Sequence, residues 1–179
     1  MQYSDARVGV DLDTQQLTHR VKTGPMPADV FVTPDDKHLL LGLTGGDGVE
    51  VYDVAGGKAP ELVKKIATGK GAHGLYVSRD SREMYVSNRG EGTISIFDFA
   101  RNKLTKKWVL PGGGSPDMGG VSTDDDGQWL SRRYDAEVYA IDTRTGKGLA
   151  RIPVGSGPHG LAVYPQPGRY SLGHTGVFR

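Results

Sequence analysis

The stretch that decides the fold is MYVSNRGEGTISIFD, which runs from Met84 to Asp98. Its two ends, 84–87 and 93–97, are rich in β-branched and aromatic residues, and the second alternates polar with apolar residues as a half-buried strand does. Between them, NRGEG (88–92) contains an asparagine and two glycines, which adopt positive φ angles at low cost. The stretch therefore predicts two antiparallel strands joined by a tight turn. Because an isolated hairpin is marginal in water, we expect neighbouring strands to cover it.

The same pattern, an apolar run that ends in aspartate, recurs along the chain. Four aspartates follow such runs at steps of 40, 45 and 44 residues: Asp13, Asp53, Asp98 and Asp142. Four valines that close short apolar runs repeat at steps of 45, 44 and 42 residues: Val32, Val77, Val121 and Val163. This period is typical of a four-stranded propeller blade, whereas HEAT-type repeats of similar length would need amphipathic helical runs that the sequence lacks. We therefore predict an all-β protein, a β-propeller of about four four-stranded blades.

The aspartates divide this single predicted domain into blades. Residues 1–13 are predicted to form the closing strand of a split blade, and four further segments follow: 14–53, 54–98 and 99–142 as full blades, and 143–179 as the last blade. Within the first full blade we expect a strand from Leu17 to Thr23.

The two ends of the chain raise the question of how the ring closes. A chain that begins with a closing strand and ends without one predicts that residues near Val8 to Leu12 pair with the last blade, because this removes two sheet edges. We expect such a closed monomer. The alternatives are that the blades form a piece of a larger ring, or that two copies form a dimeric ring.

Composition excludes several classes of function. The 179 residues include 27 glycines and 36% hydrophobic residues, which suits a turn-rich all-β domain. The absence of cysteine excludes disulfides, thiolate metal sites and a cysteine nucleophile. A net charge of +1 provides no field for a polyanion, so nucleic-acid binding is not indicated. No segment approaches the roughly 18 consecutive apolar residues of a membrane-spanning helix, so a soluble protein is expected.

Four segments resemble the repeat of the YVTN β-propeller family. They are YVSN (85–88) for the motif that names the family, TISIFD (93–98) for its closing strand, GPHG (157–160) for the start of a blade, and TPDD (33–36) for a turn. The tail PGRYSLGHTG (167–176) is similar to that of a secreted bacterial subgroup, in which WLSRRY (129–134) would be expected to have glycine in place of Arg132. The resemblance implies a propeller fold and an extracytoplasmic location, although MQYSDARVGV (1–10) lacks the basic start and apolar region of an export signal.

The repeat also indicates where a site should lie. Alignment on the four valines places four residues at one equivalent position: Ala28, His73, Asp117 and His159. Equivalent residues of successive blades form a ring around the channel, and two imidazoles with a carboxylate suit a divalent metal such as Zn, Cu or Ni. His174 could add a third nitrogen. The resemblance favours another interpretation, in which the repeated histidine bonds loop carbonyls and holds neighbouring blades together.

No catalytic constellation is legible in the sequence. It contains no G-x-S-x-G elbow, and no serine has a spacing to histidine that indicates a nucleophile and its base. Our leading hypothesis is a non-catalytic propeller that binds a small ligand, a metal or a protein partner at its channel face through His73, Asp117, His159 and His174, with no cofactor evident beyond a divalent metal. The alternative is a metal-assisted hydrolase of lactones or similar small esters, which some propellers that look similar are.

Overall fold

The computed structural model describes residues 2–163, which form fourteen β-strands and two short 3-10 helices. The helices are η1 (Gln2–Ser4) and η2 (Ala55–Gly57). Neither is long and apolar enough to cross a membrane.

The strands of residues 2–163 form one two-stranded and three four-stranded antiparallel sheets. The two-stranded sheet consists of β1 (Ala6–Val10) and β2 (Leu17–Lys22). The first four-stranded sheet consists of β3 (Pro27–Val32), β4 (His38–Leu43), β5 (Gly48–Asp53) and β6 (Glu61–Ile66). The second consists of β7 (Ala72–Val77), β8 (Glu83–Asn88), β9 (Thr93–Asp98) and β10 (Lys103–Val109). The third consists of β11 (Pro116–Val121), β12 (Gly127–Arg132), β13 (Glu137–Asp142) and β14 (Gly148–Pro153).

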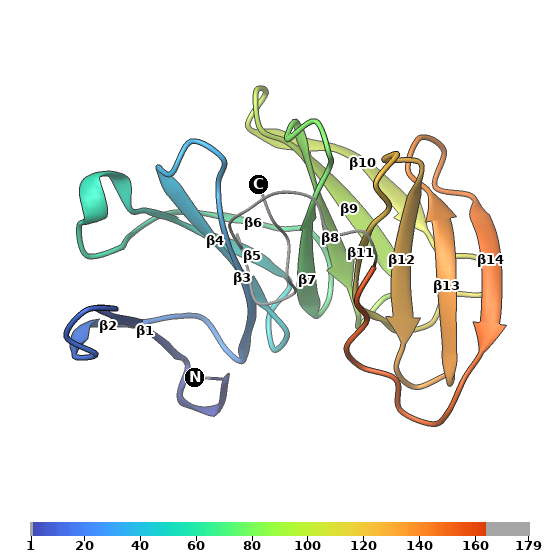
Figure 1. The fold of residues 1–179 in the computed structure, drawn as a ribbon, viewed down its shortest axis with the longest axis horizontal. Coiled ribbons are helices and arrows are strands. Elements are labelled where there is room, and N and C mark those ends of the chain that lie inside the picture. The colour runs from blue at the N-terminus through green and yellow to red at the C-terminus, as the bar shows by residue number, and fades with distance from the viewer. Residues whose placement is uncertain (1, 164–179) are drawn as a thin grey trace.

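The three four-stranded sheets stand side by side like the blades of a propeller (Figure 1). Their first strands lie innermost, because β3 contacts β7 and β7 contacts β11 across the blade boundaries. Their last strands, β6, β10 and β14, lie at the outer rim and carry most of the exposed strand residues. The predicted all-β propeller of about four blades is confirmed, with the fourth represented by the β1–β2 sheet.

The hairpin that decides the fold forms as its sequence predicts. β8 and β9 pair without a bulge, from Glu83 opposite Asp98 to Asn88 opposite Thr93. The turn between them closes through the Gly92 amide, which donates to the Asn88 carbonyl at 3.1 Å, and Gly92 has a φ of +67°. The side chain of Asn88 is completely buried and donates to the hydroxyls of Thr93 and Ser95, both at 3.0 Å. This asparagine therefore fixes the turn from inside the blade.

Alternation predicts one buried and one exposed face for each closing strand, and the structure corrects this expectation. Ile94 and Ile96 are buried as predicted, but their neighbours Ser95 and Phe97 are buried as well. The reason is that the β7–β10 sheet packs between two other sheets, so both of its faces contact protein. Ile94 and Ile96 belong to the cluster shared with β11–β14, and Phe97 belongs to the cluster shared with β3–β6.

The sheets also divide the chain differently from the aspartate markers. β2, expected in the blade that ends at Asp53, pairs instead with β1. In each complete sheet the strand that follows the marker aspartate returns to pair with the strand before it, as β6 does with β5. The hydrogen-bonded units are therefore 27–66, 72–109 and 116–153. A short turn favours this pairing, because consecutive antiparallel strands are the cheapest to bring together.

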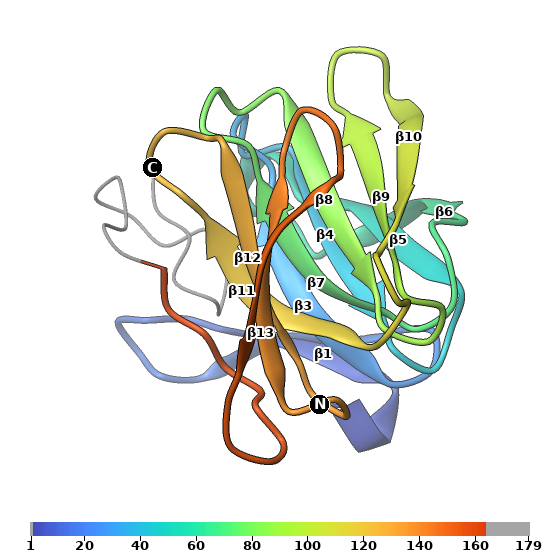
Figure 2. The same cartoon turned by 90° about the vertical axis from the view of Figure 1, so that its right-hand side faces the viewer.

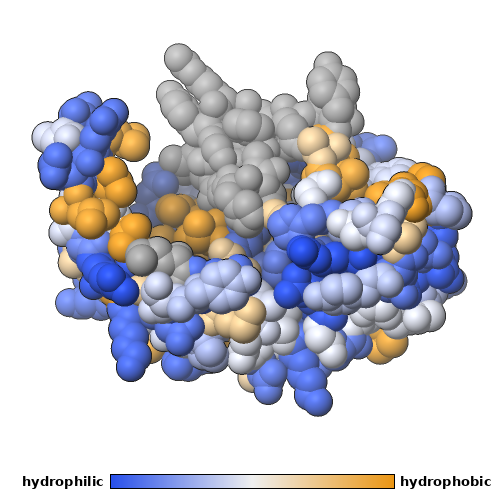
Figure 3. All heavy atoms as spheres, turned by 90° about the horizontal axis from the view of Figure 1, so that it is seen from below, coloured by the Kyte–Doolittle hydropathy of each residue, from blue (hydrophilic) through white to orange (hydrophobic). Residues whose placement is uncertain are grey.

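The predicted closure of the ring within the chain is wrong for the described residues. β1 pairs with β2 and not with β11–β14, and the two sheets lie at opposite ends of the molecule (Figure 1). Figure 2, viewed from the end with β11–β14, shows β1 behind that sheet. Residues 155–163 instead run beside the third blade, where Ser131 Oγ donates to the His159 carbonyl at 2.7 Å. The β1–β2 hairpin leaves hydrophobic side chains exposed, including Val10, Leu12 and Leu17, and Figure 3 shows such residues gathered at that end.

Candidate functional site

The residues that the repeat aligns do occupy equivalent places in the fold. His73 is the second residue of β7, Asp117 the second residue of β11, and Ala28 the second residue of β3. His159 lies in the segment that follows β14. The ring position therefore lies on the innermost strands, next to the propeller axis.

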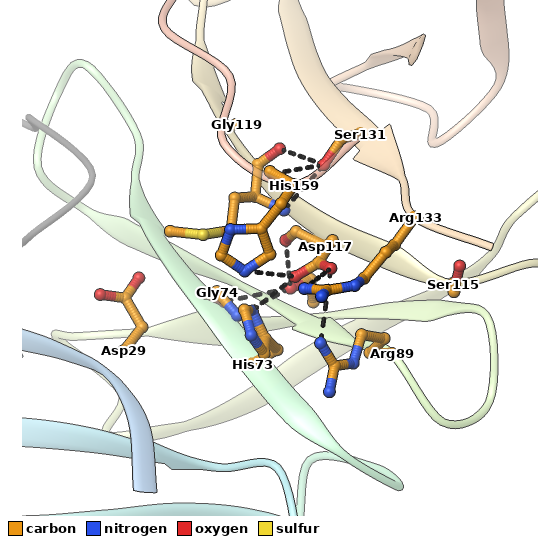
Figure 4. A network of polar contacts seen from close by, with 12 residues as sticks. Asp29, His73, Gly74, Arg89, Ser115, Asp117, Gly119, Ser131, Arg133 and His159 are labelled. Atoms are coloured by element: carbon orange, nitrogen blue, oxygen red, sulfur yellow. Dashed lines mark hydrogen bonds and ion pairs between the residues drawn. The ribbon is translucent and has the colours of Figure 1, made fainter. Parts of the chain in front are cut away.

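Small residues on the second strand of each blade hold this ring position in place. Ser87 Oγ on β8 donates to the Asp117 carbonyl at 3.2 Å, and Ser131 Oγ on β12 donates to the His159 carbonyl at 2.7 Å. At the equivalent place on β4, a methyl group on Gly42 would lie 2.9 Å from the His73 carbonyl oxygen. The second and third blades thus each hydrogen-bond to the main chain of the segment that follows, and the side chains of His73, Asp117 and His159 are turned toward one another (Figure 4).

The side chains of His73, Asp117 and His159 converge. His73 Nδ1 lies 3.0 Å from Asp117 Oδ1, and His159 Nε2 lies 3.9 Å from the same oxygen. The two imidazole rings are 5.9 Å apart at their centroids and nearly perpendicular. One nitrogen or oxygen of each residue falls within 4.8 Å of the other two. The three side chains therefore surround a common point, and Figure 4 shows their polar atoms turned toward one another.

Burial differs among the three residues. The Asp117 side chain is completely buried, His73 is 7% exposed and His159 is 48% exposed. Asp117 Oδ1 faces both imidazoles and pairs with each of them when that imidazole is protonated. A metal ion would supply positive charge to this buried oxygen at the same point.

The other carboxylate oxygen faces two arginines. Arg89 Nη1 lies 3.4 Å and Arg133 Nη1 3.8 Å from Asp117 Oδ2. Burial raises the pKa of the Asp117 carboxyl, even though the positive charges of Arg89, His159 and Arg133 favour its ionised form. The carboxylate is thus divided between two environments, with guanidinium groups at Oδ2 and imidazoles at Oδ1.

Sequence reasoning missed both arginines, although a signal was present. Arg89 and Arg133 each come two residues after the serine that grips the next blade, so they share one repeat position. Alignment of the turns as well as the strands would have placed them together. A third neighbour, Asp29, does not join the cluster, because its carboxylate accepts from the Val30 and Leu75 amides, both at 2.9 Å.

Two other residues of the sequence analysis lie elsewhere. His174 is outside the described residues. Arg132, which stands where the subgroup would be expected to have glycine, is buried and points away from His73 and His159 toward the outer part of the blade. Its guanidinium contacts Glu137 at 2.8 Å and Asp135 at 3.2 Å. The departure at this position therefore leaves the channel cluster intact.

Two cavities open along the seams between blades, away from the channel cluster. One, of about 580 Å³, lies between the first two complete sheets and has Leu40, Val51 and Phe97 among its lining residues. The other, of about 380 Å³, lies between the second and third complete sheets, beside Arg132 and Tyr139. Their linings include charged residues, such as Asp35 and Lys64 in the larger cavity and Arg151 in the smaller, but the residues that the repeat aligns lie at the channel.

Comparisons with known proteins agree on the fold. Residues 1–168 match the family described as YNCE-like beta-propeller. The solved structure titled Kuenenia stuttgartiensis hydrazine synthase is 23% identical, with a TM-score of 0.70 over 95% of this chain and 47% of that chain. A functionally unknown protein from Desulfotomaculum acetoxidans DSM 771 is 16% identical, with a TM-score of 0.67 over 87% of this chain and 54% of that chain. No curated protein matches the sequence. The chain spans about half the length of these two solved chains, and at such identities the likeness shows the fold alone.

Proposed function

Because the chain belongs to the YNCE-like β-propeller family, whose fold is a scaffold compatible with many activities, we propose its function from the channel cluster itself. We propose that it is a non-catalytic binding protein that holds a divalent transition-metal ion through His73, Asp117 and His159. The observation that carries this proposal is the convergence of their ligand atoms within 4.8 Å.

The donor set suits this class of ion. Imidazole nitrogens and a carboxylate oxygen are ligands that zinc, nickel and copper accept, and zinc binds them at about 2.0–2.2 Å. The separations of 3.0 and 3.9 Å from Asp117 Oδ1 to the two imidazoles are close to those between neighbouring ligands around such an ion. A metal ion would give the buried Oδ1 a permanent cation, whereas the two imidazoles are charged only when they are protonated.

The interpretation of the histidines as blade fasteners is compatible with one of these contacts, because His73 on β7 and Asp117 on β11 come from adjacent blades and lie 3.0 Å apart. The Ser131 hydroxyl donates a hydrogen bond to the main-chain carbonyl of His159. That contact needs no particular side chain at the ring position. The imidazole of His159 is instead turned toward Asp117, which is the arrangement that metal binding requires.

A second candidate is the metal-assisted hydrolysis of lactones or similar small esters. Three protein ligands leave a coordination position open, and the half-exposed His159 lies on the accessible side of the cluster. Arg89 and Arg133 beside Asp117 are permanently protonated, so in such a reaction they could stabilise negative charge but could not serve as the general base.

Assembly of the ring forms part of the proposal. β1 corresponds in the repeat to β5, β9 and β13, each of which pairs on both sides, whereas β1 pairs on one side within residues 2–163. An open strand edge is a template for another strand. We propose that a second copy covers this edge in a homodimer. Light scattering tests this, since a concentration-independent monomer would refute it.

The metal site is tested by titration of chelator-treated, untagged protein with Zn²⁺ and Ni²⁺ in a calorimeter. One ion per chain is expected for the wild type, and His159→Ala should weaken binding at least tenfold because it removes one of three ligands. His159 is the best position to change, since it is half exposed and its loss should leave the fold intact.

His19→Ala is the matched control, because His19 lies on β2 outside the cluster. Equal affinity of the wild type and His159→Ala would refute the site. A lactone panel on the same metal-loaded proteins separates the two candidates. Hydrolysis that disappears in His159→Ala would establish the second function in place of the first.

A further inference from the structure

Two arginines beside the channel cluster have more binding capacity than the protein uses. Arg89 and Arg133 both approach Asp117 Oδ2, at 3.4 and 3.8 Å. Each guanidinium carries five N–H donors in a planar fork. Among the described residues, the hydrogen bond and ion pairs of these two side chains all go to this one oxygen.

An arginine of the third blade provides a comparison, because its guanidinium makes several short hydrogen bonds to one carboxylate. Arg151 donates to both oxygens of Glu137 through Nε and Nη2, at distances between 2.8 and 3.2 Å. Arg89 and Arg133, by contrast, make single and longer contacts with a carboxylate that they share. Most of their donors therefore remain for a partner that the chain itself does not supply.

The charges at the channel point to the sign of that partner. Two guanidiniums face one carboxylate, so this group of three side chains has a net charge of +1 before any metal binds. A divalent ion at His73, Asp117 and His159 would raise the excess further. The nearby carboxylate of Asp29, which accepts from two main-chain amides, offsets part of this excess.

The position of the two arginines also suits a ligand from the channel. Their side chains are 15% and 39% exposed, so both are partly buried and partly accessible to solvent. Figure 4 shows them on the side of Asp117 away from the imidazoles, with their guanidinium groups near each other. Because they come from adjacent blades, a ligand between them would contact two rigid sheets.

From these observations we propose that Arg89 and Arg133 bind a small oxyanion, a carboxylate or a phosphate group, at the channel face. Planar forks of N–H donors match the oxygens of such groups, and paired donors give charge-assisted hydrogen bonds. The inference deepens the proposed function, since the same anion would lie close to the open coordination position of the metal. Binding of the oxyanion by the two guanidinium groups, however, does not depend on the metal.

Calorimetric titration of the metal-free protein with oxalate, and separately with phosphate, tests whether Arg89 and Arg133 bind an oxyanion without the metal. Arg89→Gln and Arg133→Gln should each weaken binding of the better probe about tenfold or more, because each removes one fork. Arg133→Lys, which keeps the charge and loses the fork, should fall between Arg133→Gln and the wild type. Arg82→Gln is the control, since Arg82 is 83% exposed and its ion-pair partner is Asp80.

The same titrations repeated with Ni²⁺-loaded protein distinguish the two proposals. Oxyanion binding that depends on Arg89 and Arg133 in protein that takes up no metal would uphold this inference and refute the metal site. Metal binding with oxyanion affinities equal in Arg89→Gln, Arg133→Gln and Arg82→Gln would refute this inference and leave the metal site standing. Thermal melts of each variant show that the fold is retained, and Arg133, the more exposed of the pair, provides the test if Arg89→Gln does not fold.

Discussion

Replacement of Glu91 by glutamine removes a charge from the turn of the hairpin that decides the fold. The Glu91 carboxylate accepts from the Thr93 hydroxyl at 2.6 Å, the Lys107 ammonium at 2.8 Å and the Lys70 amide at 3.0 Å. It thereby ties together the loop before β7, the β8–β9 turn and β10. Burial alone would raise the pKa of Glu91, but the hydrogen bonds from Lys107, Thr93 and Lys70 outweigh it and lower the pKa to about 2.

The size of the expected effect follows from this pKa. A fall from the ordinary value of 4.5 to about 2 corresponds to about 3 kcal/mol of stability at pH 7, since each pKa unit is worth about 1.36 kcal/mol. Solvent screening of a carboxylate that is 25% exposed reduces this to about 1–2 kcal/mol. Because the folded pKa of Glu91 is lowered, its contribution is complete above pH 4.5 and is lost as the pH falls toward 2.

Urea denaturation of the wild type and Glu91→Gln between pH 7 and pH 3 measures this contribution. At pH 7 the variant should be less stable by about 1–2 kcal/mol, a shift of about 0.5 M in the urea midpoint. The difference should shrink steadily below pH 4.5. Glu61→Gln should change stability by less than about 0.5 kcal/mol, because Glu61 is 76% exposed and lies 3.6 Å from Lys58. A difference between wild type and Glu91→Gln that does not vary with pH would refute the reasoning.

Three further changes probe the blades and their grip on the channel. Ile96→Ala should lower the free energy of unfolding by about 2–5 kcal/mol in urea denaturation, because a completely buried side chain leaves a cavity. Ser131→Ala removes the hydroxyl that donates to the His159 carbonyl, and should weaken metal binding by calorimetry about two- to tenfold without changing a ligand. Gly42→Ala places a methyl group 2.9 Å from the His73 carbonyl oxygen, and should cost about 1–3 kcal/mol in urea denaturation and weaken metal binding.

Matched controls exist for these variants. Lys106→Ala on the exposed side of β10 should cost less than about 0.5 kcal/mol, and a cost equal to that of Ile96→Ala would contradict the assigned packing. Gly155→Ala adds a methyl group with no atom within 4 Å, so it should leave both stability and metal affinity unchanged. Wild-type metal affinity in Ser131→Ala or Gly42→Ala would show that the contacts of these residues with the main chain of the ring position do not position the ligands.

Much of the fold could be predicted because short local sequence patterns determine it and these patterns repeat along the chain. The segment from Met84 to Asp98 specifies a hairpin through its β-branched strands and its NRGEG turn, and the period of the aspartates sets the size of the blade. The exposure of each strand face could not be predicted in the same way. Alternation marks the two faces of a strand, but Ser95 and Phe97 are buried because a neighbouring blade covers the second face.

The candidate site was predictable to the extent that it follows the repeat. Alignment on the valines placed His73, Asp117 and His159 at one ring position, and the structure brings them within reach of one another. Arg89 and Arg133 were not found, because arginine after a strand is an ordinary turn residue when each repeat is considered by itself. Their meaning depends on Asp117, which comes from a different strand.

Closure of the ring lies beyond what the sequence pattern can decide. The expectation that Val8 to Leu12 would pair with the last blade came from the removal of open edges, which is a general tendency of sheets. In the structure the segment that includes His159 packs against β12, and β1 pairs with β2. Such a choice depends on contacts between distant parts of the chain that no local signal records.

The measurement that tests the central claim most directly is an anomalous difference map from crystals of the protein grown with Zn²⁺ and measured at the zinc edge. The account predicts one strong peak per chain at about 2.0–2.2 Å from an imidazole nitrogen of His73, an imidazole nitrogen of His159 and an oxygen of Asp117. A map with no peak at these three residues, or with zinc bound at other histidines only, would contradict it.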